Sequence, residues 1–298
     1  MHQKTVVPDP SFISQREFQI ARNVDWLFAP LRNAMTVAAA TALVIGSLAL
    51  LPIVLLQGRA TRRRVPILPP AKAPHHGRVS GDGEPIRLLA IGESSVSGIG
   101  VARGEDTVAA VTARALARQT GRSVVWRALG LSGATVRDAI EQVLPRVPPE
   151  PTDLVVVGFG VNDATSYRSP KAFADDLEEL VQAVRHRVGD AAVVVAGVAP
   201  LDAFPALPWP MRNILGWRSA LMQAAVERLP QRLGRLVVER FSLPFTPDLF
   251  ASDKFHPNAK AHRLWGEEIA TLALALVDTR QKRNRRDLTT PHASGQAA

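Results

Sequence analysis

Between residues 86 and 278, apolar runs of strand length alternate with longer amphipathic segments. Runs such as Leu154-Val155-Val156-Val157 are apolar at every position, which is typical of parallel strands buried on both faces. The pattern predicts an α/β fold, a three-layer α/β/α sandwich around a five-stranded parallel sheet. Strands are expected at 86–92, 123–128, 153–159, 191–198 and 235–241, and helices at about 105–120, 134–146, 170–188, 216–232 and 258–277.

Residues 34–57 form a run of 24 positions without a charged side chain. About 20 apolar residues suffice for a helix to span a bilayer. A cleaved signal peptide fits poorly, because the run starts late and is too long. We therefore expect a single-pass membrane protein rather than a helix buried in a soluble core. Five basic residues follow the run and three precede it, so the charge bias leans toward a cytoplasmic catalytic domain, with an exported domain behind an uncleaved anchor left open.

The remaining segments differ from the globular part in composition. Residues 1–33 form a polar N-terminal segment, and 58–85 form a linker that is first basic and then rich in Pro and Gly. Residues 86–278 form the folded domain. Residues 279–298 are polar and basic and are expected to be a disordered tail.

The net charge of +9 lies in the flanks of the chain: residues 1–83 carry +6, 84–278 carry −1 and 279–298 carry +4. A neutral globular part does not indicate nucleic-acid binding. Basic flanks suit solvated tails or an anionic membrane surface. The chain has no cysteine, which excludes disulfides, thiol nucleophiles and cysteine-based zinc sites.

Ser94 follows the first expected strand, in the turn Gly92-Glu93-Ser94. Open α/β sheets place their ligands at the carboxyl ends of the strands, so a serine there is a candidate nucleophile. The turn matches neither the glycine pattern of dinucleotide-binding loops nor the Gly-x-Ser-x-Gly nucleophile elbow. Taken alone, it is typical of an ordinary polar turn.

Potential hydrogen-bond donors follow the second and third strands. Gly133 lets a backbone N–H approach a ligand without a Cβ in the way, and Asn162 offers two uncharged side-chain N–H donors. Both suit a developing oxyanion, and both are also common turn residues.

Asp253 and His256 precede the last expected helix, three positions apart. A carboxylate that holds an imidazole facing a hydroxyl is the logic of a catalytic triad, in the chain order Ser…Asp…His. The alternative is a capping Asp beside a packed His. His186 is expected on a helix surface and His262 inside the last helix, and the spacing of His256 and His262 predicts no metal site.

Four short blocks together resemble, in order and spacing, the SGNH/GDSL hydrolases: Gly92-Glu93-Ser94, Gly133, Gly160-Val161-Asn162-Asp163 and Asp253-x-x-His256. The resemblance covers roughly residues 86–277 and implies a flavodoxin-like sandwich and a bacterial-type membrane-anchored serine esterase or lipase. It implies that Ser94 is the nucleophile, His256 the base and Asp253 the residue that orients it. It also implies an oxyanion hole formed by Ser94 N–H, Gly133 N–H and the Asn162 side chain.

The chain departs from the family pattern at two positions. Glu93 stands where the family usually has Asp, which keeps the charge but adds a methylene group beside Ser94. Lys254 stands where the family often has Gly, and we expect its side chain to be exposed. Neither change removes a catalytic group.

Residues 199–217 are too rich in proline for regular structure, and their apolar side chains suggest a wall or lid over the site. These side chains are Phe204, Leu207, Trp209, Met211 and Ile214. We therefore predict cleavage of carboxylic esters with an acyl or apolar group through an acyl-enzyme, without cofactor, metal or nucleic acid. The alternatives are O-deacetylation of a carbohydrate or cell-envelope polymer, and a non-catalytic binding domain.

Overall fold

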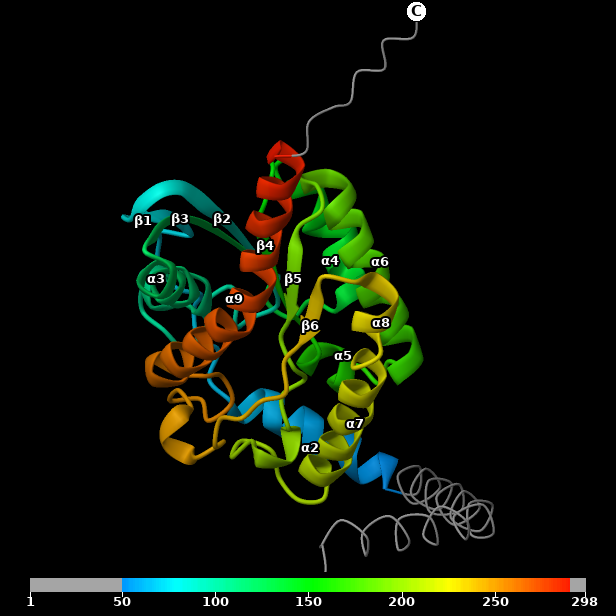
Figure 1. Ribbon diagram of the computed structural model, residues 1–298. Coiled ribbons are helices and arrows are strands. Elements are labelled where there is room, and N and C mark those ends of the chain that lie inside the picture. The colour runs from blue at the N-terminus through cyan, green and yellow to red at the C-terminus, as the bar shows by residue number, and fades with distance from the viewer. Residues whose placement is uncertain (1–49, 290–298) are drawn as a thin grey trace, which may run out of the picture. The chain divides into compact units, whose positions relative to one another are not determined.

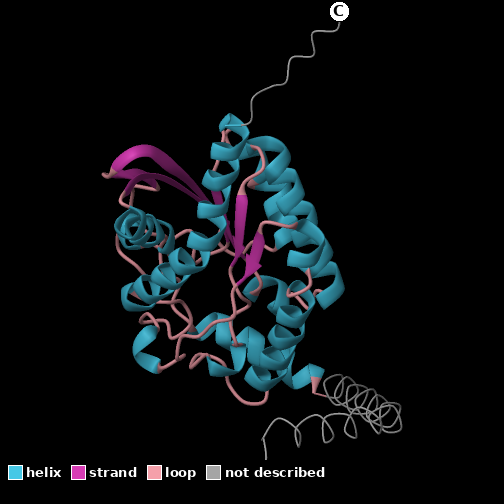
Figure 2. Ribbon diagram, in the orientation of Figure 1, coloured by secondary structure: helices cyan, strands magenta, loops and turns pink. Residues whose placement is uncertain are grey.

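The computed structural model describes residues 50–289 and contains a six-stranded mixed sheet with helices on both faces (Figures 1 and 2). The strand order is β1-β3-β2-β4-β5-β6, with β1 antiparallel to β3 and the other pairs parallel. The α/β/α sandwich is confirmed, with one antiparallel edge strand beyond the five parallel strands expected. The strands are β1 (His76–Val79), β2 (Asp82–Gly92), β3 (Arg122–Gly130), β4 (Leu154–Gly158), β5 (Ala192–Val195) and β6 (Leu236–Val238).

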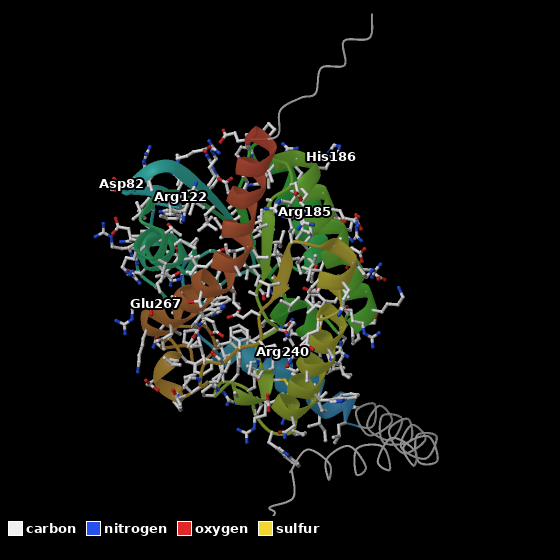
Figure 3. The ribbon with its side chains drawn as sticks, viewed as in Figure 1. Asp82, Arg122, Arg185, His186, Arg240 and Glu267 are labelled. Carbon is white, nitrogen blue, oxygen red and sulfur yellow. The ribbon has the colours of Figure 1, made fainter. Side chains whose placement is uncertain are left out.

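Two layers of helices cover this sheet. α3 and α9 pack together on one face, and α4, α6 and α8 lie on the other (Figure 1). Arg185 of α6 donates hydrogen bonds to the carbonyls of Leu233 and Gly234, so α6 fixes the turn that leads into β6 (Figure 3). The helices are α2 (Leu51–Arg64), α3 (Val108–Thr120), α4 (Val136–Gln142), α5 (Val161–Thr165), α6 (Pro170–Val188), α7 (Met211–Val226), α8 (Leu229–Leu233) and α9 (Ala259–Thr289).

Three glycines lie in register where the central strands end. Gly92 of β2 pairs with Gly130 of β3 and with Gly158 of β4. A Cβ at Gly92 would come within 2.3 Å of Val96, and one at Gly130 within 2.3 Å of the Ser97 backbone. Only glycine therefore lets the turn after β2 fold back over the strand ends, and that turn carries Ser94.

The membrane prediction is wrong. Within residues 50–289, no helix combines the length and the apolar character needed to cross a membrane, and this finding overturns the single-pass assignment over 34–57 and the localisation built on it. Residues 34–49 lie outside the described part of the chain. Residues 51–57 form the first half of α2, whose second half carries Arg59 and Arg62–Arg64, and charges of this kind disfavour insertion into hydrocarbon.

Three further segments differ from the expectations. The segment predicted as a linker, 58–85, contains the end of α2, the edge strand β1 and the start of β2. α9 continues to Thr289, into the segment 279–298 that was predicted to be a disordered tail. α7 begins at Met211, inside the stretch judged too rich in proline for regular structure, because its last proline, Pro210, lies at the N-cap.

Candidate active site

Three side chains from distant parts of the sequence form a hydrogen-bonded series. Ser94 lies in the turn after β2, and its Oγ is 3.1 Å from Nε2 of His256. Nδ1 of the same imidazole is 2.6 Å from Oδ2 of Asp253. The loop before α9 supplies both Asp253 and His256, so the sheet brings this loop to the end of β2. The arrangement can transfer the hydroxyl proton of Ser94 to the imidazole.

The environment of Asp253 keeps it ionised. Burial alone would raise the pKa of this carboxyl, but hydrogen bonds from the His256 side chain and from the backbone N–H groups of His256 and Phe255 outweigh burial and lower the pKa. An ionised carboxylate only accepts hydrogen bonds, so Nδ1 of His256 carries its proton. Nε2 is then the acceptor that faces Ser94.

Two backbone N–H groups near Ser94 are candidates for oxyanion donors. Gly133 follows β3, is exposed and has a φ of 79°, a left-handed value that favours glycine. Within residues 50–289, the backbone N–H groups of Ser94 and Gly133 donate to no protein atom. Both donors can therefore bind a developing oxyanion without breaking an existing hydrogen bond.

Asn162, the third expected donor, is already engaged. Its Nδ2 group donates to Oε2 of Glu93 and, at 3.1 Å, to the carbonyl of Ala134. To donate to an oxyanion, the amide must release one of these partners. The Ala134 carbonyl is the partner that the amide can exchange, because Glu93 also accepts from the backbone N–H of Asn162 and so stays beside the amide.

Glu93 binds the loop after β4 through three donors. Its carboxylate accepts from the backbone N–H of Val161 at 3.0 Å, from that of Asn162 at 3.0 Å, and from the Asn162 amide. Burial raises the pKa of Glu93 to about 8, although the backbone donors lower it, and the nearby Asp163 adds to the rise. The longer side chain at position 93 thus orients the candidate oxyanion donor.

An apolar pocket of about 100 Å³ opens beside Ser94 and His256. Its floor consists of small residues at the ends of β4 and β5, and its walls are aromatic. No polar side chain other than Glu93, Ser94, Ser95 and His256 lines it within the described chain. The aromatic walls come from Phe159, Phe204, Phe241, Phe245, Phe250, Phe255 and Trp265.

Edge-to-face ring contacts connect these walls to the imidazole. The Phe204 ring lies 5.2 Å from the rings of Phe250 and Phe255, and Phe255 lies 5.2 Å from the ring of His256. Of the five large apolar side chains expected in the lid, Phe204 alone lines the pocket within the described chain, beside the small Ala199; Trp209, for example, is 72% exposed. The phenylalanines of 241–255 were not predicted as site residues, although their density before the candidate histidine was a readable signal.

A second buried carboxyl, that of Glu239, binds two residues that line the pocket. Oε2 of Glu239 accepts from Nε1 of Trp265 at 2.9 Å and from the backbone N–H of Gly197 at 3.3 Å. Burial raises the pKa of Glu239 to about 7. The residue fixes one aromatic wall relative to the end of β5, and no sequence motif pointed to it.

His262 has a structural role, and His186 and Lys254 lie on the surface. Buried His262 accepts through Nδ1 from the backbone N–H of Val108 at 3.0 Å, which satisfies the first turn of α3, and burial lowers its pKa to about 4. His186 is exposed on α6 (Figure 3). Lys254 is exposed, as expected, and its φ of 58° explains why the family often has glycine there.

Comparison with known proteins gives one family. Residues 90–264 match the model of the GDSL-like Lipase/Acylhydrolase family. A GDSL-like esterase of Mycobacterium tuberculosis is 32% identical over 273 residues, which cover 84% of this chain and 84% of the esterase.

Solved structures share the fold. A carbohydrate esterase family 2 enzyme of Corynascus thermopiles (Myceliophthora fergusii) has a TM-score of 0.52 at 18% identity, over 71% of this chain and 69% of the other. A family 3 carbohydrate esterase of Clostridium thermocellum has a TM-score of 0.52 at 15% identity, over 66% and 98%. At such identities the likeness concerns the fold alone.

Proposed function

The chain belongs to the GDSL-like lipase/acylhydrolase family and is a carboxylic ester hydrolase, and on that premise we propose that Ser94 is its nucleophile, with His256 as base and Asp253 as the group that orients the base. The observation that carries the proposal is the continuous hydrogen-bonded series of these three side chains. Ser94 Oγ lies 3.1 Å from His256 Nε2, and His256 Nδ1 lies 2.6 Å from Asp253 Oδ2.

In the acylation step, Ser94 Oγ attacks the ester carbonyl carbon while Nε2 of His256 takes the hydroxyl proton. The ionised Asp253 stabilises the imidazolium that forms. The same proton then passes to the leaving alcohol as the carbon–oxygen bond breaks. A water molecule, deprotonated by His256, releases the acid and restores Ser94.

The oxyanion that forms at the carbonyl oxygen needs fixed donors. The backbone N–H groups of Ser94 and Gly133 have no competing acceptor within residues 50–289. Asn162 supplies a third donor when its amide exchanges the Ala134 carbonyl for the oxyanion. The second N–H of the same amide continues to donate to Glu93.

The apolar pocket suits the acyl group of the ester. It lies beside the nucleophile, and its walls consist mostly of phenylalanine side chains. At about 100 Å³, it is comparable in scale to the ~150 Å³ apolar cavity known to bind benzene. A short acyl chain, such as a butyryl group, is the ligand that this size and polarity favour.

Labelling with a fluorophosphonate probe tests the nucleophile, because only an activated serine reacts with it. We expect labelling of Ser94, identified by mass spectrometry of the modified peptide, and its loss in Ser94→Ala. The adjacent serine provides the control, since Ser95→Ala should label like the wild type. If the wild-type protein does not react with the probe, the result would instead favour a non-catalytic binding domain.

Filling the pocket should change the preference for acyl chain length. Ala199 lines the pocket and is partly exposed. We expect Ala199→Leu to lower kcat/KM for p-nitrophenyl butyrate and hexanoate by about tenfold or more, with little change for the acetate, because the added atoms occupy the space of the longer acyl chain.

Ala203→Leu is the matched control, since Ala203 lies four residues further on, is also partly exposed and does not line the pocket. A uniform loss across the ester series in Ala199→Leu would contradict the acyl assignment. If the wild-type protein hydrolyses only acetate esters, the result would instead favour the O-deacetylase function.

A further inference from the structure

A second hollow, lined by different residues, lies on the other side of the turn that carries Ser94. It has a volume of about 370 Å³, and Val96 and Ser97 of the turn line it, whereas Glu93, Ser94 and Ser95 line the apolar pocket. The end of β3 and the following residues up to Ser132 form another wall. Gly133, the candidate oxyanion donor, is the next residue.

Four basic side chains line this hollow: His75, His76, Arg127 and Arg146. No acidic side chain of the described chain lines it. Arg127 and Arg146 are exposed, and neither forms an ion pair or a side-chain hydrogen bond with any residue in 50–289. Their guanidinium donors are therefore available to a ligand.

The sheet register brings two of these groups close together. His76 of β1 pairs directly with Arg127 of β3. Side chains at directly opposite positions have Cβ atoms about 4.5–5.5 Å apart, so the imidazole and the guanidinium can contact the same ligand. The planar guanidinium also matches the geometry of phosphate and carboxylate groups.

We propose that this hollow is a subsite for an anionic group, a phosphate or a carboxylate, on the part of the ester that remains outside the apolar pocket. The inference rests on the proposed function, because Ser94 must lie between the two hollows when the ester is cleaved. The substrate would then combine a short apolar acyl group with an anionic alcohol.

Matched ester pairs test the subsite on the full chain. The first pair is glycerol 1-butyrate with and without a 3-phosphate, and the second is 4-carboxyphenyl butyrate against 4-carbamoylphenyl butyrate. We expect a higher kcat/KM for the anionic member of at least one pair, and the preference should fall as salt is added. The variant Arg127→Gln/Arg146→Gln should lose on the order of 10- to 100-fold on that member alone.

Arg212→Gln/Arg228→Gln is the control, since both arginines are exposed outside the hollow and the double replacement removes the same charge. Equal rates within both pairs, or a preference that survives in the double variant, would overturn the subsite. Failure of the proposed function has a different signature: no member of either pair is cleaved, or Ser94→Ala cleaves both members of each pair at the wild-type rate.

Discussion

Replacing Ser94 with alanine is expected to lower kcat for p-nitrophenyl butyrate by roughly 10⁴- to 10⁶-fold, because it removes the atom that forms the acyl-enzyme. His256→Ala should cause a loss of similar size, since without a base the hydroxyl of Ser94 keeps its proton. The two residues act as a unit, so the double variant should be about as slow as either single variant. Steady-state hydrolysis followed by absorbance of nitrophenolate measures all three.

Ser95→Ala is the control for this experiment. Ser95 is partly exposed, lines the same pocket and follows Ser94 directly, but it lies outside the hydrogen-bonded series. Its variant should hydrolyse the ester like the wild type. Near-normal kcat in Ser94→Ala or in His256→Ala, with thermal unfolding unchanged, would reject the proposed mechanism.

The sequence predicted the sheet well because its central strands are apolar at nearly every position. β4 and β5 are buried along their full length, and such runs have few other stable environments. Ser94, Gly133 and Asn162 follow β2, β3 and β4, so the parallel topology predicts that these three residues lie at one edge of the sheet, whereas Asp253 and His256 come from the loop before α9. The edge strand β1 was missed because His-Gly-Arg-Val has no alternating apolar pattern, and it gains its order from pairing with β3.

Contacts between segments far apart in the chain were not predictable from local patterns. The hydrogen bond from Asn162 to Glu93 joins the ends of β2 and β4. The sequence shows only that Glu93 is one methylene longer than Asp, and this does not reveal which donors its carboxyl group binds. The membrane prediction failed for a related reason. An uncharged run was interpreted by length alone, while its described end continues as a helix that carries arginines.

Asn162→Ala should lower kcat by on the order of 10²- to 10³-fold with a smaller change in KM, since an oxyanion donor acts chiefly in the transition state. Asn213→Ala, at an exposed position of α7, is the matched control and should behave like the wild type. A kcat close to that of the wild type in Asn162→Ala would show that the two backbone donors suffice, and would remove Asn162 from the proposed oxyanion hole.

Glu93→Gln then tests how Asn162 is positioned. Because burial raises the pKa of Glu93 to about 8, the carboxyl is mostly protonated at neutral pH, and we expect it to orient Asn162 most strongly once ionised. We expect kcat of the wild type to rise as pH passes through about 8, and this rise to be absent in Glu93→Gln, which does not titrate. The pH dependence of stability has the opposite sign: the raised pKa of Glu93 contributes stability that is fully present below the ordinary carboxyl pKa of 4.5 and is lost as pH rises through about 8. If Glu93→Gln keeps the same rise in kcat, the effect belongs to another group and Glu93 does not position Asn162.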